Sequence, residues 1–138
     1  MTRRSGSNMP IPLVLITRFF QLVSERKFAE AERVLERVTE KIAKNENKEF
    51  NDGYLYGLRG IILSTRSTGE SDSFLSNFNS NDTNGLKKYH KEFLNMSENG
   101  LHADYDRGYF SALAEYTRVS LKIAQNRNKN SSDQRASN

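Results

Sequence analysis

One stretch of this chain decides its fold: Glu49-Phe-Asn-Asp-Gly-Tyr-Leu-Tyr-Gly-Leu-Arg-Gly-Ile-Ile-Leu-Ser64. On a helix, Gly53, Gly57 and Gly60 recur at intervals of four and three residues, so they share one face. Each glycine inside a helix costs roughly 0.5–1 kcal/mol relative to alanine. That cost is explained if another helix lies very close to this face. We therefore predict a helix over 48–66 as the central helix of an all-α domain, with these three glycines at sites of close helix packing.

Part of this stretch has an echo later in the chain. Phe50-Asn-Asp-Gly-Tyr-Leu-Tyr-Gly-Leu58 aligns without gaps to Tyr105-Asp-Arg-Gly-Tyr-Phe-Ser-Ala-Leu113. Gly53 then matches Gly108, and the next glycine matches Ala112. Both true duplication and chance would produce this likeness. In physical terms it predicts two equivalent helices, each offering a notch of small residues to a neighbour. Gly108 and Ala112 therefore join the predicted close-packing sites.

Hydrophobic periodicity predicts four further helices. The first spans about 12–24, after prolines that suit the lead-in of a helix. The second begins at Phe28 and has the most regular apolar stripe of the chain. The last two begin near Asp82 or Thr83, either of which can cap a helix, and near Tyr105. Helices joined by short connections pack antiparallel, so we predict about five helices in antiparallel hairpins or an irregular bundle.

Length and composition indicate one domain between two tails. The chain has 138 residues, of which 36% are hydrophobic, enough for a single core. Residues 1–8 and 125–138 are polar and basic and are predicted to be disordered. Residues 9–124 then form the helical domain. A long polar connection at 67–83, of open role, interrupts it.

The net charge of +4 lies in the tails. Residues 1–8 and 122–138 hold six basic side chains against Asp133 alone, whereas the rest of the chain has 15 basic and 16 acidic residues. A folded surface that holds a nucleic-acid backbone would normally carry the excess itself. Nucleic acid is therefore a possible partner through the tails only.

Several classes of protein are disfavoured by composition. The chain has no cysteine, which excludes disulfides, thiolate metal sites and a cysteine nucleophile. No apolar run approaches the roughly 20 residues that span a bilayer. The run at 11–16 is short and lacks the small-residue cleavage site of a signal peptide. We therefore expect a cytoplasmic protein without a membrane partner.

A second pattern lies in Gln21-Leu-Val-Ser-Glu-Arg-Lys-Phe-Ala-Glu-Ala-Glu-Arg-Val-Leu-Glu-Arg-Val38, where Phe28 and Ala31 follow a turn. It resembles the middle of a tetratricopeptide repeat, with an aromatic residue after the turn and an alanine at the close helix contact. The resemblance covers residues 13–64 at most, and it lacks a third repeat register and the proline that ends each repeat. It implies helical hairpins with a groove, and hence partner binding.

The blocks Asn51-Asp-Gly-Tyr54 with Gly57-Leu-Arg-Gly60, and Leu101-His-Ala-Asp-Tyr-Asp-Arg-Gly-Tyr109, are also similar to a group of short helical archaeal proteins without an assigned activity. This resemblance implies no mechanism.

Candidate chemistry gathers near the second block. His102 and Asp106 are four residues apart, so on one helix face they could bind a metal or act as a base and its orienting group. The better interpretation places Asp104 and Asp106 in a first helical turn, where the helix dipole favours them. No second histidine-rich motif completes a site. We therefore predict no metal, no cofactor and no catalytic residue, and an enzyme is the third-ranked hypothesis.

Polar residues near the echoed blocks are interpreted as structural. Asp52 and Arg59, with counterparts including Asp106 and Arg107, predict buried Asp–Arg pairing between the two echoed helices rather than a catalytic dyad. Most tyrosines fall on core stripes. Tyr56 lies off the stripe and is expected to be exposed.

The leading hypothesis is a non-enzymatic adaptor or scaffold. It would bind a protein partner, or self-associate, through a concave face between helical hairpins that is lined by Tyr56, Arg59, His102 and Arg107. The alternative is an accessory factor of an RNA-containing assembly that uses its basic tails. The identity of the partner and the oligomeric state stay open.

Overall fold

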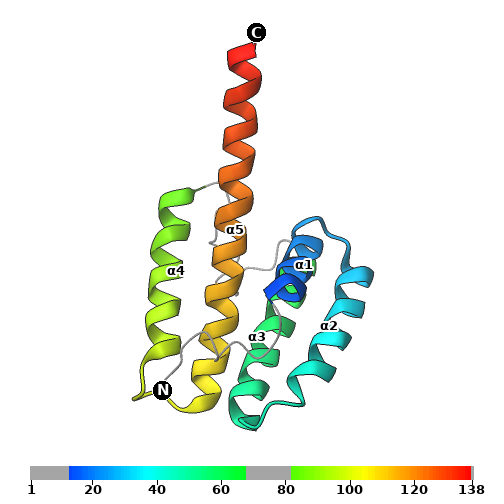
Figure 1. The fold of residues 1–138 in the computed structure, drawn as a ribbon, viewed down its shortest axis with the longest axis vertical. Coiled ribbons are helices and arrows are strands. Elements are labelled where there is room, and N and C mark those ends of the chain that lie inside the picture. The colour runs from blue at the N-terminus through cyan, green and yellow to red at the C-terminus, as the bar shows by residue number, and fades with distance from the viewer. Residues whose placement is uncertain (1–12, 68–81, 138) are drawn as a thin grey trace.

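The structure is a computed structural model that describes residues 13–67 and 82–137 (Figure 1). The predictions for residues 1–8 and for most of the connection at 67–83 lie outside the described residues. The described chain contains five helices and no strand, which confirms the all-α fold. The helices are α1 (Leu13–Ser24), α2 (Phe28–Ile42), α3 (Lys48–Arg66), α4 (Thr83–Glu98) and α5 (Asp104–Ser137).

Side-chain caps fix where α3 and α4 begin. Asn47 accepts a hydrogen bond from the Phe50 N–H at 3.1 Å, and Asp82 accepts one from the Gly85 N–H at 3.0 Å. Each bond satisfies a backbone donor that has no partner within its own helix. Of the two residues proposed from the sequence to cap α4, Asp82 is the cap.

The fifth helix is longer than the sequence led us to expect. We predicted that order ends near Ala124, whereas α5 continues to Ser137. The prediction rested on the absence of apolar residues to bury. A helix needs only its own i to i−4 backbone bonds, and no proline or glycine interrupts the chain after Gly108. The extension projects beyond the rest of the molecule (Figure 1).

Two hairpins meet through a central pair of parallel helices. α2 and α3 run antiparallel, as do α4 and α5, while α3 and α5 lie side by side and point the same way (Figure 1). α4 packs closely along α5. α2 packs mainly on α1, which also contacts α3 and α5. The predicted central helix, α3, therefore shares that position with α5.

The core is built around α1. Its inward side chains are almost completely buried, and removing each such side chain from water contributes about 1.5–3 kcal/mol. The α1 residues concerned are Ile16, Phe19, Phe20, Leu22 and Val23. Phe20 also meets Tyr116 of α5 edge to face, with ring centroids 5.5 Å apart. One short helix thereby joins both hairpins to a common core.

Both echoed glycines, Gly53 and Gly108, lie at the contact between α3 and α5. A Cβ atom placed on Gly53 would overlap the carbonyl oxygen of Tyr105, and one placed on Gly108 would overlap the carbonyl oxygen of Phe50. Because Phe50 aligns with Tyr105 and Gly53 with Gly108, these two contacts are the same contact with the helices exchanged. Such reciprocity is the property of a two-fold axis.

The residue pair on that axis is Gly57 and Ala112, which align with each other. A Cβ atom on Gly57 would lie 2.8 Å from the Cβ of Ala112, so the site has room for one methyl group and not for two. Small residues four apart on both of two parallel helices allow the backbones to approach closely, as in membrane helix pairs. The two small-residue notches therefore fit each other rather than other neighbours.

Gly60 does not belong to this contact. It is exposed, and a Cβ atom placed on it would have nothing within 4 Å among the atoms of the described chain. Gly60 lies one turn beyond Gly57, and its prediction as a close-packing site is wrong. The regular spacing of the three glycines does not show how far along α3 the close contact extends.

Candidate functional site

A groove of about 410 Å³ lies between α1 and α5. Leu13 and Val14 of α1 and Val119 and Ile123 of α5 form its apolar part. Val14 has 82% of its surface exposed and Leu13 has 48%. Apolar side chains left open in this way mark a surface that can exchange water for a ligand.

Basic side chains from both helices line the same groove. Arg18 comes from α1 and Lys122 from α5, and both are exposed. Neither forms an ion pair with any residue of the described chain. The groove therefore combines an apolar floor with two cations that no residue of the described chain neutralises.

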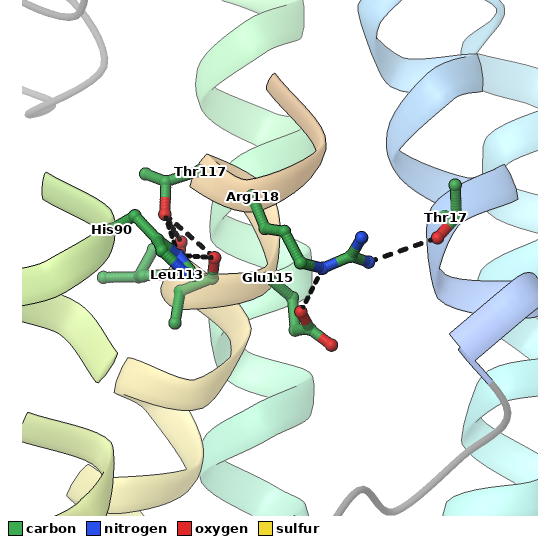
Figure 2. Close-up of polar contacts among 7 residues, drawn as sticks. Thr17, His90, Leu113, Glu115, Thr117 and Arg118 are labelled. Atoms are coloured by element: carbon green, nitrogen blue, oxygen red, sulfur yellow. Dashed lines mark hydrogen bonds and ion pairs between the residues drawn. The ribbon is translucent and has the colours of Figure 1, made fainter. Parts of the chain in front are cut away.

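The third cation of the groove, Arg118, is neutralised. Its Nε donates to a carboxylate oxygen of Glu115 at 2.7 Å, one turn earlier on α5. Its Nη2 donates to the hydroxyl of Thr17 on α1 at 3.2 Å, and Figure 2 shows the guanidinium spanning the space between the two helices. Arg118 thus ties the walls of the groove together, while its charge is offset by Glu115.

A buried hydroxyl lies near this polar cluster. Tyr54 of α3 is fully buried, and its OH has no hydrogen-bond partner among the described residues. Burial raises the pKa of Tyr54 well above its ordinary value, the charge of Glu115 raises it further, and Arg118 opposes the shift. A neutral phenol sealed from the groove cannot exchange protons with a bound molecule, so Tyr54 belongs to the fold rather than to a reactive site.

A second polar cluster joins α4 to α5. His90 Nδ1 donates to the carbonyl oxygen of Ala114 at 3.0 Å and lies 3.4 Å from the hydroxyl of Thr117 (Figure 2). Thr117 is fully buried, and its hydroxyl lies within hydrogen-bonding distance of the carbonyls of Leu113 and Ala114. The contacts of His90 hold α4 and α5 together, whereas the bonds of Thr117 to the two carbonyls lie within α5. His90 is half-buried and has a structural role.

The four residues predicted to form one partner-binding face are not brought together. Tyr56 is 59% exposed, and its ring centroid lies 6.1 Å from that of Tyr105 and 5.8 Å from that of Tyr109. Arg59 is exposed on the next turn of α3. No contact within the described chain joins either of them to His102 or to Arg107. The concave face formed by all four residues stays a prediction, because no contact in the described chain assembles them into one site.

His102 and Arg107 lie instead where α4 turns into α5. The His102 ring packs against Phe110, with centroids 5.9 Å apart. Arg107 donates from Nε to the carbonyl oxygen of Ser97 at 3.0 Å and contacts Asp104 at 3.5 Å. Arg107 thus satisfies a carbonyl near the end of α4. Both side chains stabilise this corner of the fold.

The predicted buried Asp–Arg pairing between α3 and α5 does not occur among the described residues. Asp52, Arg59 and Asp106 are all exposed. The buried polar residue at this end of α3 is Asn51, whose amide donates to the carbonyl of Ile42 at 2.9 Å and thereby caps α2. A neutral amide satisfies the helix end without the cost of burying a charge.

Metal binding and membrane insertion find no support in the described part of the chain. Residues 13–67 and 82–137 contain no group of three or more His, Cys, Asp or Glu side chains that could hold a metal ion. Across the same ranges, no helix combines the length and the apolar character that a bilayer crossing requires.

The fold and the groove define a class: a small all-α protein of two helical hairpins and an additional helix, with a half-open groove between the first helix and the last. Comparison with known proteins narrows this class no further, because no protein-family model, curated protein or solved structure matches the chain.

Sequence reasoning missed the groove. Val14 and Arg18 lie four residues apart and off the buried stripe of the first helix, so their exposure could have been inferred. What the pattern does not contain is the position of Lys122 and Ile123 beside them, because this depends on how α1 packs on α5.

Proposed function

We propose that this chain is a non-enzymatic helical adaptor that binds a helical segment of a protein partner in the groove between α1 and α5. The observation that carries the proposal is the groove itself, which has a volume of about 410 Å³ and in which Val14 and Leu13 leave apolar surface open to water. Amphipathic helices bind by laying their apolar face into such grooves.

The lining of the groove supports binding rather than catalysis. Its described residues include no carboxylate and no imidazole, the groups that most often transfer protons in enzymes. Tyr54, which is fully buried, keeps its hydroxyl protonated and covered. The resemblance of residues 13–64 to tetratricopeptide hairpins supports the same interpretation, because that resemblance implies a groove for a partner.

A site-specific cross-linking experiment tests the proposal. A photoreactive amino acid replaces Val14 in the groove or, as the control, Leu101, which is 94% exposed in the connection between α4 and α5. We expect a discrete protein adduct from position 14 only. The identified protein should then bind the purified chain, and Val14→Glu should abolish this binding. Equal adducts from both positions, or none, would contradict the proposal.

An RNA-associated role stays the second candidate. The projecting part of α5 carries the exposed side chains of Arg127 and Lys129, beyond Lys122. Binding to RNA through them should weaken steeply with salt. It should disappear when residues 125–138 are removed. Salt-independent binding, or binding that survives the truncation, would exclude this route.

A further inference from the structure

We infer that the occupant of the α1–α5 groove is an acidic amphipathic helix, with apolar side chains against Val14 and Ile123 and carboxylates beside Arg18 and Lys122. This inference rests on the proposed function and adds the chemistry of the partner. Its basis is the arrangement of charge and apolar surface in the groove, together with the length of its walls.

The positive charge of the groove indicates that its partner carries negative charge. Arg18 and Lys122 come from opposite walls, both are exposed, and neither has an ion-pair partner in the described chain. Arg118 is the cation of the groove that is already paired, with Glu115 at 2.7 Å. A ligand with carboxylates on both flanks of an apolar stripe would meet one cation on each side. Charges placed in this way choose between partners and accelerate their association.

The dimensions fit about two turns of helix. The lining residues extend from Leu13 to Gln21 on α1 and from Arg118 to Asn126 on α5. At 1.5 Å per residue each wall is about 12 Å long, slightly more than two turns. A helix presents residues i, i+3 or i+4, and i+7 to one side over that length. Three apolar side chains of the partner can therefore contact the groove at once.

Other occupants fit less well. The first eight residues of the chain contain Arg3 and Arg4 and no acidic residue, so the chain's own N-terminal segment has the same sign as the groove. A second copy that docked through the same groove would place its own Arg18 and Lys122 against those of the first copy. An anionic acyl chain matches the charge, but the 82% exposure of Val14 would leave much of the chain in water. A helix buries only one face and suits a half-open groove.

The experiment uses a designed peptide as the probe. A fluorescein-labelled peptide of about 15 residues carries leucines at i, i+4 and i+7 and glutamates on both flanks, and a matched peptide carries lysines in place of the glutamates. Binding to the full chain is measured by fluorescence anisotropy. We expect the acidic peptide to bind at least about tenfold more tightly than the basic one, because two favourable pairs become two repulsive ones.

Charge reversal in the protein provides the second arm. Arg18→Glu with Lys122→Glu should weaken binding of the acidic peptide at least about tenfold and should improve binding of the basic peptide. The control, Lys87→Glu with Lys91→Glu, makes the same change of charge on exposed positions of α4, on the other side of α5 (Figure 1), and should change affinity less than about twofold. Far-UV circular dichroism checks that all variants stay folded.

Three results would overturn the inference. Equal binding of the two peptides would do so, as would an equal loss of affinity in the groove and control variants. Binding of dodecanoate without binding of either peptide would assign the groove to an amphiphile instead. The proposed function is tested separately: if the partner captured at Val14 still binds after Arg18→Glu and Lys122→Glu, the adaptor role stands and only its acidic partner is wrong.

Discussion

Gly53→Ala tests the central contact of the fold directly. The added methyl group would overlap the carbonyl oxygen of Tyr105 and would lie 2.8 Å from its carbonyl carbon. These are backbone atoms, so no side chain can rotate away, and α3 and α5 must separate. Overpacking of a core costs about 1–3 kcal/mol, and a backbone clash belongs at the upper end of that range. The gain in helix propensity returns about 1 kcal/mol, so the net loss should be about 2 kcal/mol.

The matched control is Gly60→Ala on the same helix. Its methyl group meets nothing within 4 Å in the described structure, so only the propensity gain of about 0.5–1 kcal/mol applies. The two variants should therefore differ by about 3 kcal/mol in the free energy of unfolding, measured by urea titration with far-UV circular dichroism. Gly108→Ala should resemble Gly53→Ala because the contact is reciprocal. If all three variants were equally stable, the parallel packing of α3 on α5 would be refuted.

Three further changes test other parts of the fold. Gly57→Ala should destabilise the fold by about 1–3 kcal/mol. Adding Ala112→Gly should restore stability to within about 1 kcal/mol of the wild type, because the double variant keeps one methyl group on the axis. A double-mutant cycle without coupling would contradict this. Arg26 has φ of 61° and donates to the Thr65 carbonyl at 3.1 Å, so Arg26→Ala and Arg26→Gly lose the same contact, but the glycine variant should be more stable by about 1 kcal/mol in thermal denaturation. Tyr54→Phe should stabilise by about 1 kcal/mol near neutral pH because it removes an unsatisfied hydroxyl. The raised pKa of Tyr54 makes the folded wild type lose stability as the pH rises above about 10, where the unfolded chain ionises first, so the advantage of Tyr54→Phe should grow there; a constant difference across that range would contradict it.

The local features of the fold could be predicted from the sequence. Periodicity placed α3 at 48–66, and the two candidate capping residues, Asp82 and Thr83, placed the start of α4, where Asp82 is the cap and Thr83 the first helical residue. These features depend on neighbours within one or two turns, which the sequence displays directly. α5 extends past Ala124, although the residues beyond it offer little apolar surface to bury, because a helix requires only its own backbone bonds.

The features that depend on distant residues could not be predicted. The small residues indicated a close neighbour, but nothing local to Gly53 shows that its neighbour is the matching block around Gly108. The groove is a stronger case, because Thr17 and Arg118 join its walls across 101 positions of sequence. The partners of the predicted face residues also come from distant positions: Tyr56 of α3 contacts Tyr109 of α5, whereas Arg107 of α5 contacts Ser97 of α4.

One wall of the groove is α1, a helix that takes no part in the reciprocal contact between α3 and α5. The small residues of α3 and α5 pack against each other, and α4 covers another face of α5. α1 has no counterpart in this arrangement, and its first turn extends past the core to leave Val14 open. Two contacts with α5 nevertheless fix the position of α1. Phe20 packs against Tyr116, and Thr17 accepts a hydrogen bond from Arg118. Because both walls are held before any ligand arrives, binding need not order them, and a ligand of only two helical turns can gain affinity from a small contact area.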